Sequence, residues 1–169
     1  MKKVVVTGGS GFIGSNLVKY LLEKKFFVIN IDKLSYSAHP HNLQNVLKHK
    51  NYVFFKTDIN NKKKLIKIFN KYKPICIFNL AAETHVDRSI DTPENFVKSN
   101  FLGTYNLLES ILNFEKKNKK KIKLVHVSTD EVYGDILKGR SNESFAYNPS
   151  SPYSATKAGA DHLIKAYIR

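Results

Sequence analysis

Cysteine is almost absent from this chain of 169 residues, which holds a single one, Cys76. One thiol cannot form a disulfide within the chain, so a disulfide-stapled fold is excluded. Cys76 lies in the apolar run Ile75–Phe78. A cysteine in such a run is typical of a small packed hydrophobic residue rather than of a reactive thiol.

Long hydrophobic runs are missing as well. No apolar stretch approaches the length of a membrane span, and no charged, apolar and small-residue succession resembles a signal peptide. We therefore expect a cytoplasmic protein with no membrane partner. The 42% of hydrophobic residues suits a globular fold, and the length suits one domain with its own core, residues 1–169.

Acidic residues are scarce beside basic ones: 14 Asp and Glu face 28 Lys and Arg, for a net charge of +14. Such a charge suggests a nucleic-acid binder. The basic residues are nearly all lysines, however, in runs at 62–64, 116–117 and 119–121 without interleaved arginines or aromatics. Those side chains would be needed to contact guanine edges or to stack on bases. We expect a solvated basic surface and no nucleic-acid partner.

Short apolar runs alternate with segments of helical spacing along the chain. The runs predict five strands, at 3–7, 28–32, 52–57, 75–80 and 123–128. The helical segments include 12–24, 62–72 and one that begins after Thr92 as N-cap and Pro93, with apolar residues up to position 112. Strands that are apolar throughout and joined by helices predict an α/β fold: a doubly wound, Rossmann-like parallel sheet. Its last helix, 153–169, stops uncapped, so we expect the fold to be incomplete at the C-terminus.

A glycine-rich segment joins the first predicted strand to the first helix. Gly8 permits a tight turn, Gly11 lets the backbone approach a pyrophosphate, and Gly14 allows the helix to pack closely on the strand. The helix N-terminus favours phosphates. Asp32 ends the second strand, where a carboxylate can bind a ribose 2′-hydroxyl and repels a 2′-phosphate. The spacing predicts a dinucleotide site that prefers NAD to NADP.

Polar or small residues close the next two strands. Asp58 and Ile59 follow the third strand, where a carboxylate can reach an adenine amine, and Asn79–Ala82 closes the fourth. The alternative for each of these two segments is an ordinary strand end that contacts no ligand. Their appearance at successive strand ends favours one ligand lying across the carboxyl edge of the sheet.

Two further motifs carry acid-base chemistry. Ser128–Gly134 places a hydroxyl and two carboxylates directly after an apolar strand. Tyr153 and Lys157 stand one helical turn apart, so both project from one helix face. An acid, a base, a hydroxyl donor and a phenol beside an ammonium group are the parts needed to dehydrate a sugar nucleotide. The alternative for the two carboxylates is an acid pair on the surface.

These motifs resemble a known superfamily. The glycine run, the Asn79–Ala82 element and Tyr153-x-x-x-Lys157 are similar to the extended short-chain dehydrogenases/reductases. Three longer segments resemble the dTDP-glucose 4,6-dehydratase family: Leu80–Ile90, Ser128–Gly134 and Pro149–Ala158. The resemblance runs through the whole chain but covers only about the N-terminal half of such an enzyme. Asp130 beside Glu131 distinguishes this family from related 4-epimerases, GDP-mannose dehydratases and decarboxylases.

The resemblance implies NAD as cofactor, a nucleotide-sugar substrate and a homodimer for the full-length form. It places cofactor contacts in the glycine run, at strand ends and on two helices: Gly8, Gly11, Phe12, Ile13, Gly14, Asp32, Lys33, Leu34, Ser35, Asp58, Ile59, Leu80, Ala81, Ala82, Glu83, Thr84, Ser99, Tyr153 and Lys157. It places substrate contacts at Thr84 and Thr129.

The resemblance also implies catalytic roles. Tyr153, with its pKa lowered by Lys157 and the nicotinamide charge, would take the proton of the sugar C4 hydroxyl, to which Thr129 also hydrogen-bonds. Glu131 would remove the C5 proton, and Asp130 would protonate the departing C6 hydroxyl. The product is a 4-keto-6-deoxy sugar. A 4-epimerase or decarboxylase of the same superfamily, or a non-catalytic NAD-binding fragment, remain alternatives, and we expect the 169 residues alone to be inactive.

Overall fold

The computed structural model describes residues 1–168, apart from the side chain of Pro40. The chain groups into two compact units. The first comprises residues 1–81 and 109–127, and the second comprises residues 82–108 and the chain from residue 128 on. That both units belong to one dinucleotide-binding domain stays a prediction.

The first unit is built on a parallel sheet of five strands in the order β3-β2-β1-β4-β5. The strands are β1 (Lys3–Thr7), β2 (Phe27–Asp32), β3 (Tyr52–Lys56), β4 (Cys76–Asn79) and β5 (Lys123–His126). All five predicted strands are present: β1 has the predicted bounds, and the ends of the other four differ from the predicted ones by at most two residues. The strand order reverses between β1 and β4, and a ligand crevice in this kind of sheet lies at such a switch point.

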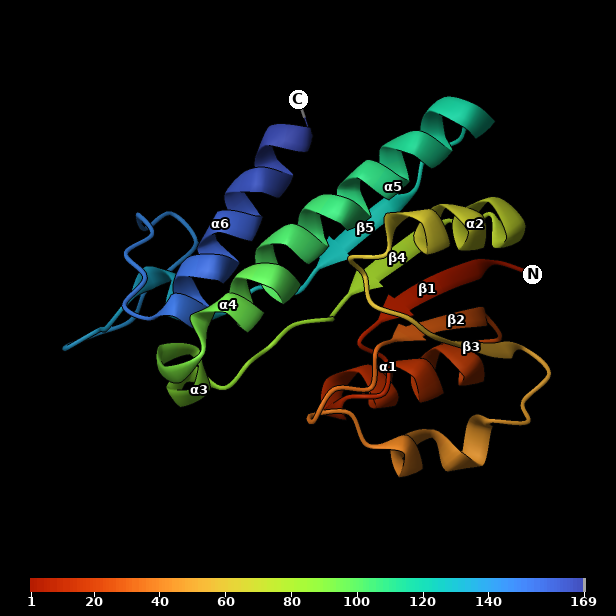
Figure 1. Ribbon diagram of the computed structural model, residues 1–169, viewed down its shortest axis with the longest axis horizontal. Helices are drawn as coiled ribbons and strands as arrows, with labels where there is room; N and C mark the ends of the chain where they lie inside the picture. The colour runs from red at the N-terminus through yellow and green to blue at the C-terminus, as the bar shows by residue number, and fades with distance from the viewer. Residues whose placement is uncertain (169) are drawn as a thin grey trace. The chain divides into compact units, whose positions relative to one another are not determined.

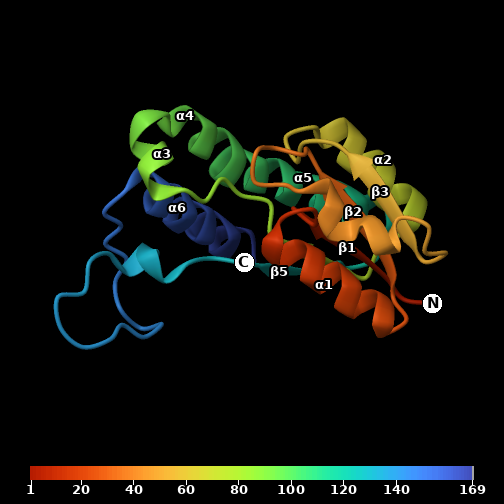
Figure 2. The same ribbon diagram turned by 90° about the horizontal axis from the view of Figure 1, so that it is seen from below.

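Helices cover both faces of the sheet. Figures 1 and 2 show α1 (Phe12–Glu23) on one face and α2 (Lys62–Tyr72) with the end of α5 (Gly103–Asn118) on the other. The short 3-10 helix η1 (Pro40–Val46) packs beside α1. The core under α1 consists of aliphatic residues from both strands and helices: Val4, Val6, Val18, Leu21, Leu22, Val28 and Leu43. This arrangement confirms the predicted doubly wound, Rossmann-like fold.

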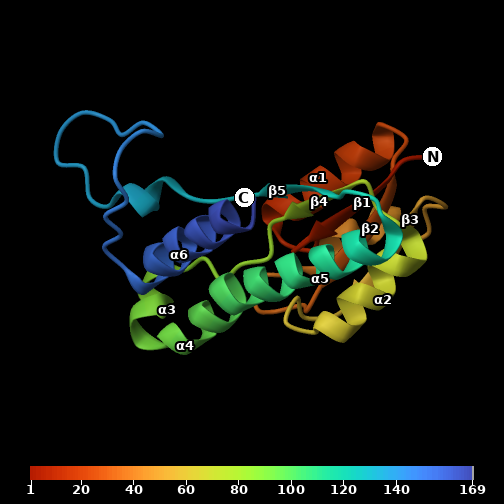
Figure 3. The same cartoon turned by 90° about the horizontal axis from the view of Figure 1, so that it is seen from above.

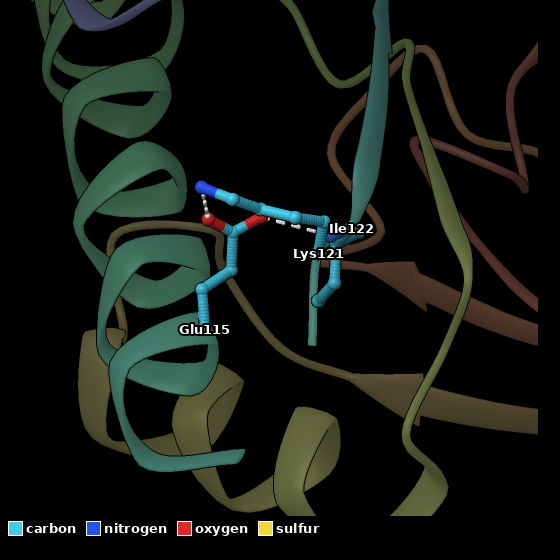
Figure 4. Close-up of polar contacts among 3 residues, drawn as sticks. All are labelled: Glu115, Lys121 and Ile122. Atoms are coloured by element: carbon cyan, nitrogen blue, oxygen red, sulfur yellow. Dashed lines mark hydrogen bonds and ion pairs between the residues drawn. The ribbon is translucent and has the colours of Figure 1, made fainter. Parts of the chain in front are cut away.

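One carboxylate closes the turn from α5 into β5. Glu115 Oε1 accepts a hydrogen bond from the backbone N–H of Ile122 at 2.8 Å, and its Oε2 lies 2.9 Å from Lys121 Nζ (Figure 4). Ile122 is buried, so its N–H needs this partner. A glutamate in the last turns of the helix thereby fixes where the following strand begins.

The second unit is helical. It contains α3 (Val86–Asp91), α4 (Pro93–Phe96), the π-helix η2 (Val97–Leu102), the 3-10 helix η3 (Asp130–Tyr133) and α6 (Pro152–Tyr167). Figures 1 and 3 show α3, α4 and α6 side by side. No helix within residues 1–168 combines the length and the apolar character that crossing a membrane requires.

The helix predicted to start at Thr92 and Pro93 differs from its sequence pattern. Pro93 does begin α4, but a π-helical turn separates α4 from α5, so the helix is not a regular one. Thr92 stands at the N-cap position without capping, because its hydroxyl donates to the Arg88 carbonyl at 3.0 Å instead. Single π turns insert one extra residue and are frequent at functional sites.

Helix α6 starts with a reciprocal capping box. Ser151 Oγ accepts from the Ser154 N–H at 3.1 Å, and the Ser154 hydroxyl accepts from the Ser151 N–H at 3.0 Å. Pro152 occupies the first helical turn, where its missing N–H costs nothing. The helix that carries Tyr153 therefore has a well-defined start.

Candidate functional site

The glycine loop after β1 has no room for a side chain at two of its three predicted glycines. Gly8 has a φ of +68°, and a Cβ placed on it would lie 2.7 Å from the backbone nitrogen of Ala81. A Cβ on Gly14 would overlap the Gly8 carbonyl oxygen. Gly11 differs: it caps α1, and a Cβ there would meet Gly8 O at an ordinary 3.4 Å. Two of the three predicted glycines are thus required by the fold, and Gly11 is free to serve a ligand.

Asp32 shapes the same loop. Its carboxylate accepts from the Ser10 N–H at 2.9 Å and from the Leu34 N–H at 2.8 Å. Leu34 has a φ of +59°, a conformation that this hydrogen bond helps to hold. Each carboxylate oxygen keeps a second lone pair, so Asp32 can still accept from a hydroxyl. The neighbouring Lys33 and Ser35 are half-buried.

The ends of β1, β4 and β5 are joined by side chains. Thr7 Oγ1 donates to Asn79 Oδ1 at 2.6 Å, and the Asn79 amide nitrogen lies 2.9 Å from His126 Nδ1. Thr7 Oγ1 also accepts from the Ala81 N–H at 3.2 Å. The network places Leu80 and Ala81 beside Gly8 at the switch point of the sheet. Thr7 was not predicted as a site residue, because a threonine at the end of an apolar strand resembles an ordinary strand end.

Asp58 has a local partner in this structure. It accepts from the backbone N–H and the side-chain amide of Asn60, at 2.8 and 3.0 Å. This turn leads into Asn61, whose side chain caps α2, while Ile59 is buried. Contact of Asp58 and Ile59 with a ligand stays a prediction. Phe12 and Ile13, by contrast, are exposed large hydrophobic side chains at the start of α1, 82% and 62% accessible.

In the second unit the predicted acid-base residues lie around one phenol. Thr129 caps η3 by accepting from the Glu131 N–H at 3.3 Å, and its hydroxyl hydrogen-bonds Tyr153. Partial burial, and then the charge of Asp130, raise the pKa of Glu131 above its usual value. A carboxyl group with a raised pKa is better matched to proton transfer near neutrality. The structure therefore brings Thr129, Asp130, Glu131 and Tyr153 together.

The Tyr-Lys pair is buried on α6. Tyr153 packs edge-on against Phe96, with ring centres 6.3 Å apart, and Lys157 is only 4% exposed. Burial raises the pKa of Tyr153; the Thr129 hydrogen bond opposes this, while Glu131 and Asp130 add to it. In the chain without a cofactor, burial and the two carboxylates outweigh the hydroxyl, and a lowering of this pKa by Lys157 and the nicotinamide charge stays a prediction. Burial also lowers the pKa of Lys157 to about 8, against the effect of Asp161.

A buried carboxamide links the segment after β4 to α6. Asn100, in the π-helix, accepts from the Glu83 N–H at 2.8 Å and donates to the Glu83 carbonyl at 3.0 Å. It also donates to Thr156 Oγ1 at 3.1 Å, and Thr156 donates to the Tyr153 carbonyl at 2.7 Å. Sequence reasoning missed Asn100, although an asparagine inside an apolar helical pattern was a usable signal.

The remaining predicted residues lie in the segment after β4 or in the π-helix η2. Glu83 and Ser99 are buried, Ala82 is half-buried, and Thr84 is exposed. Their contact with a cofactor or substrate stays a prediction. Among residues 1–168, no three His, Cys, Asp or Glu side chains gather as a metal site would require.

Comparison with known proteins identifies similar enzymes. Residues 5–169 match the family model described as GDP-mannose 4,6 dehydratase. The dTDP-glucose 4,6-dehydratase of Haemophilus influenzae is 46% identical over 176 residues, which span 100% of this chain and 52% of that enzyme. The chain thus spans about half the length of the curated relatives it matches.

Solved structures give the same result for the fold. The dTDP-glucose 4,6-dehydratase of Bacillus anthracis, in complex with NAD, is 41% identical with a TM-score of 0.85, covering 99% of this chain and 50% of that one. The UDP-glucose 4-epimerase of Thermus thermophilus, also complexed with NAD, is 33% identical with a TM-score of 0.86, covering 98% and 50%. The backbone fold therefore does not distinguish a 4,6-dehydratase from a 4-epimerase, and only the side chains of the site can do so.

Proposed function

This chain belongs to the GDP-mannose 4,6 dehydratase family, and from that membership we propose that it carries the catalytic residues of a nucleotide-sugar 4,6-dehydratase. The proposed reaction converts dTDP-glucose to dTDP-4-keto-6-deoxyglucose with the loss of one water. The observation that carries the proposal is the gathering of Thr129, Asp130 and Glu131 around Tyr153. The identity to dTDP-glucose 4,6-dehydratases supports this choice of nucleotide sugar.

The residues present fit NAD. The glycine loop has no space for side chains at Gly8 and Gly14, and the N–H groups at the start of α1 favour phosphate. Asp32 has lone pairs left for a ribose hydroxyl, which favours NAD over NADP. In the relatives crystallised with NAD, the same fold holds this cofactor. When bound, NAD would accept a hydride from C4 of the sugar and return it to C6.

Each acid-base residue then has one task. Tyr153 takes the proton of the C4 hydroxyl. The Thr129 hydroxyl, which hydrogen-bonds Tyr153 in the chain alone, hydrogen-bonds the C4 oxygen of the bound sugar. Once C4 is a ketone, the C5 proton is acidic, and Glu131 removes it. Asp130 donates a proton to the departing C6 hydroxyl. Burial, and then the charge of Asp130, raise the pKa of Glu131, which suits it to take up a proton.

Because Tyr153 has a raised pKa in the chain alone, it needs a positive charge nearby to act as a base. The ammonium group of Lys157, one helical turn away, supplies such a charge when protonated. Lys157 is therefore part of the proposed site through its charge.

A 4-epimerase is the second candidate, since an epimerase shares this backbone at a TM-score of 0.86. Epimerisation at C4 needs the Tyr-Lys pair but no acid and base at C5 and C6. The carboxylates of Asp130 and Glu131 on η3 have no task in that reaction, so their position favours dehydration.

We propose that the whole protein is a cytoplasmic homodimer. The single free cysteine suits a reducing compartment. Several large apolar side chains of the second unit are exposed, as an interface between copies requires: Ile90 65%, Val97 43%, Leu102 42% and Tyr105 40% accessible.

The test uses the protein expressed from its complete reading frame, with NAD and dTDP-glucose. We expect the substrate to lose one water and the 4-keto-6-deoxy product to accumulate. Glu131→Gln should reduce bound NAD and then stall, because C4 oxidation does not need the C5 base. Tyr153→Phe should block reduction itself. Interconversion of C4 epimers without water loss would show the second candidate to be correct.

A further inference from the structure

Asp161, on the third turn of α6, is a meeting point for residues of the second unit. Its Oδ2 accepts from the Ser128 hydroxyl at 2.5 Å and from the Tyr147 phenol at 3.2 Å. Ser128 directly precedes the segment that carries Thr129, Asp130 and Glu131. One carboxylate oxygen on α6 therefore holds the start of the acid-base segment and a residue of the loop that follows it.

Tyr147 extends this attachment. Its ring packs edge-on against Tyr133 at the end of η3, with centres 5.3 Å apart, and lies tilted against the His162 ring at 5.2 Å. Lys165 Nζ lies 5.0 Å from the centre of the same ring. The Tyr147 side chain thus packs between η3 and α6. Ser128 before η3 and Tyr133 at its end are both connected to α6, the helix that carries Tyr153 and Lys157.

Asp161 also shares a helix face with that pair. Tyr153, Lys157 and Asp161 are spaced by four residues each, which stacks them one above another along α6. Lys157 is buried, and burial of a lone ammonium group is costly unless an opposite charge is near. Asp161 is the carboxylate that favours the charged form of Lys157.

We propose that Asp161 is a positioning residue of this site: it holds the Ser128–Tyr133 segment on α6 and places a carboxylate on the helix face of Lys157. The proposal rests on the proposed dehydratase function for its consequences in catalysis. In that reaction a protonated Lys157 supports the Tyr153 base, and a fixed η3 keeps Asp130 and Glu131 within reach of the sugar. Asp161 lies outside both acid-base motifs of the sequence, Ser128–Gly134 and Tyr153-x-x-x-Lys157.

Other charged groups surround α6 and define what must be compared. The helix packs against α3, α4, η2 and η3. Besides Lys157 and Asp161, the titratable groups on these elements and on α6 itself are Asp87, Arg88, Asp91, Glu94, Lys98, Asp130, Glu131, Tyr133, Tyr153, His162, Lys165 and Tyr167, and Tyr147 contacts α6 from the adjoining loop. Asp130 and Glu131 act on the pKa of Tyr153, whereas Asp161 acts on that of Lys157. Charge removal at Asp161 therefore has a distinct signature.

The first experiment measures the pKa of Lys157 directly. The protein from the complete reading frame is labelled with ¹³C-lysine, and the Lys157 signal, assigned with Lys157→Arg, is titrated by NMR. We expect a pKa of about 8, which burial lowers against the opposing charge of Asp161. Asp161→Asn keeps a hydrogen-bond acceptor but removes the charge, so the pKa should fall further. Asp161→Glu should restore it, and Glu143→Gln, which removes an exposed charge of the same unit, should leave it unchanged.

The second experiment separates holding from charge. Ser128→Ala removes the hydrogen bond and keeps the carboxylate, so it should lower the rate of product formation while the Lys157 pKa stays as it was. Asp161→Asn should move the alkaline limb of the pH–rate profile to lower pH, because Lys157 then loses its proton earlier.

An unchanged Lys157 pKa in Asp161→Asn would overturn the proposal whether or not the enzyme turns over. Asp161→Ser serves as a second variant without charge. Loss of folding in both variants would also contradict a positioning role, since it would make Asp161 a structural residue. If the unmodified protein proves inactive on dTDP-glucose, the proposed function fails, but the titration still decides the role of Asp161.

Discussion

The side-chain amide of Asn100 lies 3.1 Å from the hydroxyl of Thr156, so the π-helix η2 is hydrogen-bonded to the helix that carries Tyr153 and Lys157. The same amide pairs with both backbone groups of Glu83. Asn100 is 2% exposed and Glu83 5%, so water cannot replace these bonds. One asparagine therefore sets the position of the post-β4 segment relative to α6.

Replacing Asn100 should cost stability. Asn100→Ala removes the hydrogen bonds that Asn100 makes with the buried N–H and carbonyl of Glu83, and we expect the free energy of unfolding to fall by about 2–4 kcal/mol. Urea unfolding monitored by circular dichroism measures this. Asn113→Ala, at an exposed position of α5, is the control and should change it by less than about 0.5 kcal/mol. Equal effects of the two variants would mean that the hydrogen bonds to Glu83 contribute nothing.

The two helix-side glycines should respond differently to a methyl group. In Gly14→Ala the new Cβ overlaps Gly8 O, so the loop must move and the melting temperature should fall even without ligand. In Gly11→Ala the Cβ fits at 3.4 Å, so the melting temperature should hold while NAD affinity drops about tenfold or more, if a pyrophosphate lies there. Thermal unfolding and NAD titration read out the two effects. Unimpaired NAD binding in Gly11→Ala would place the phosphates elsewhere.

Lys157 should make stability depend on alkaline pH. Its folded pKa of about 8 lies below the unfolded value of 10.5, so between these values the unfolded chain binds more protons. Stability therefore rises with pH in this window, by about 2 kcal/mol from about pH 8 to about pH 10, and the full cost is present below pH 8. Lys157→Met should abolish this rise in denaturant titrations, and Lys138→Met, in the exposed loop, should keep it. A rise that persists in Lys157→Met would assign it to another group.

The Glu115 carboxylate should matter through its backbone contact rather than its ion pair. Lys121 is 91% exposed, and exposed ion pairs contribute little. Glu115→Gln, which can still accept from the buried Ile122 N–H, should lower the unfolding free energy by less than about 0.5 kcal/mol. Glu115→Ala leaves that N–H unpaired and should cost about 1–3 kcal/mol. A cost for Glu115→Gln as large as that for Glu115→Ala would show that the ion pair dominates.

The amino-acid pattern by itself determined the layered architecture. Apolar strands such as β1 and β2, each followed by a helix-forming segment, bury both sheet faces in only one economical way, as parallel strands. The glycines at 8 and 14 were likewise readable, because only glycine fits where backbone meets backbone. The helix start at Pro93 was also predictable, because proline is favoured in the first helical turn.

Tertiary structure decided what periodicity does not encode. The π turn at 97–102 interrupts the predicted helix, and within it Asn100 hydrogen-bonds to Glu83, 17 residues away in the chain. Whether Tyr153 has a raised or lowered pKa depends on burial and on Glu131 and Asp130, which only folding brings near it. Asp161 gained its partners in the same way: Ser128 is 33 residues distant in sequence. Local spacing predicts which residues share a helix face, but hydrogen bonds and charges between distant segments exist only once packing has set their distances.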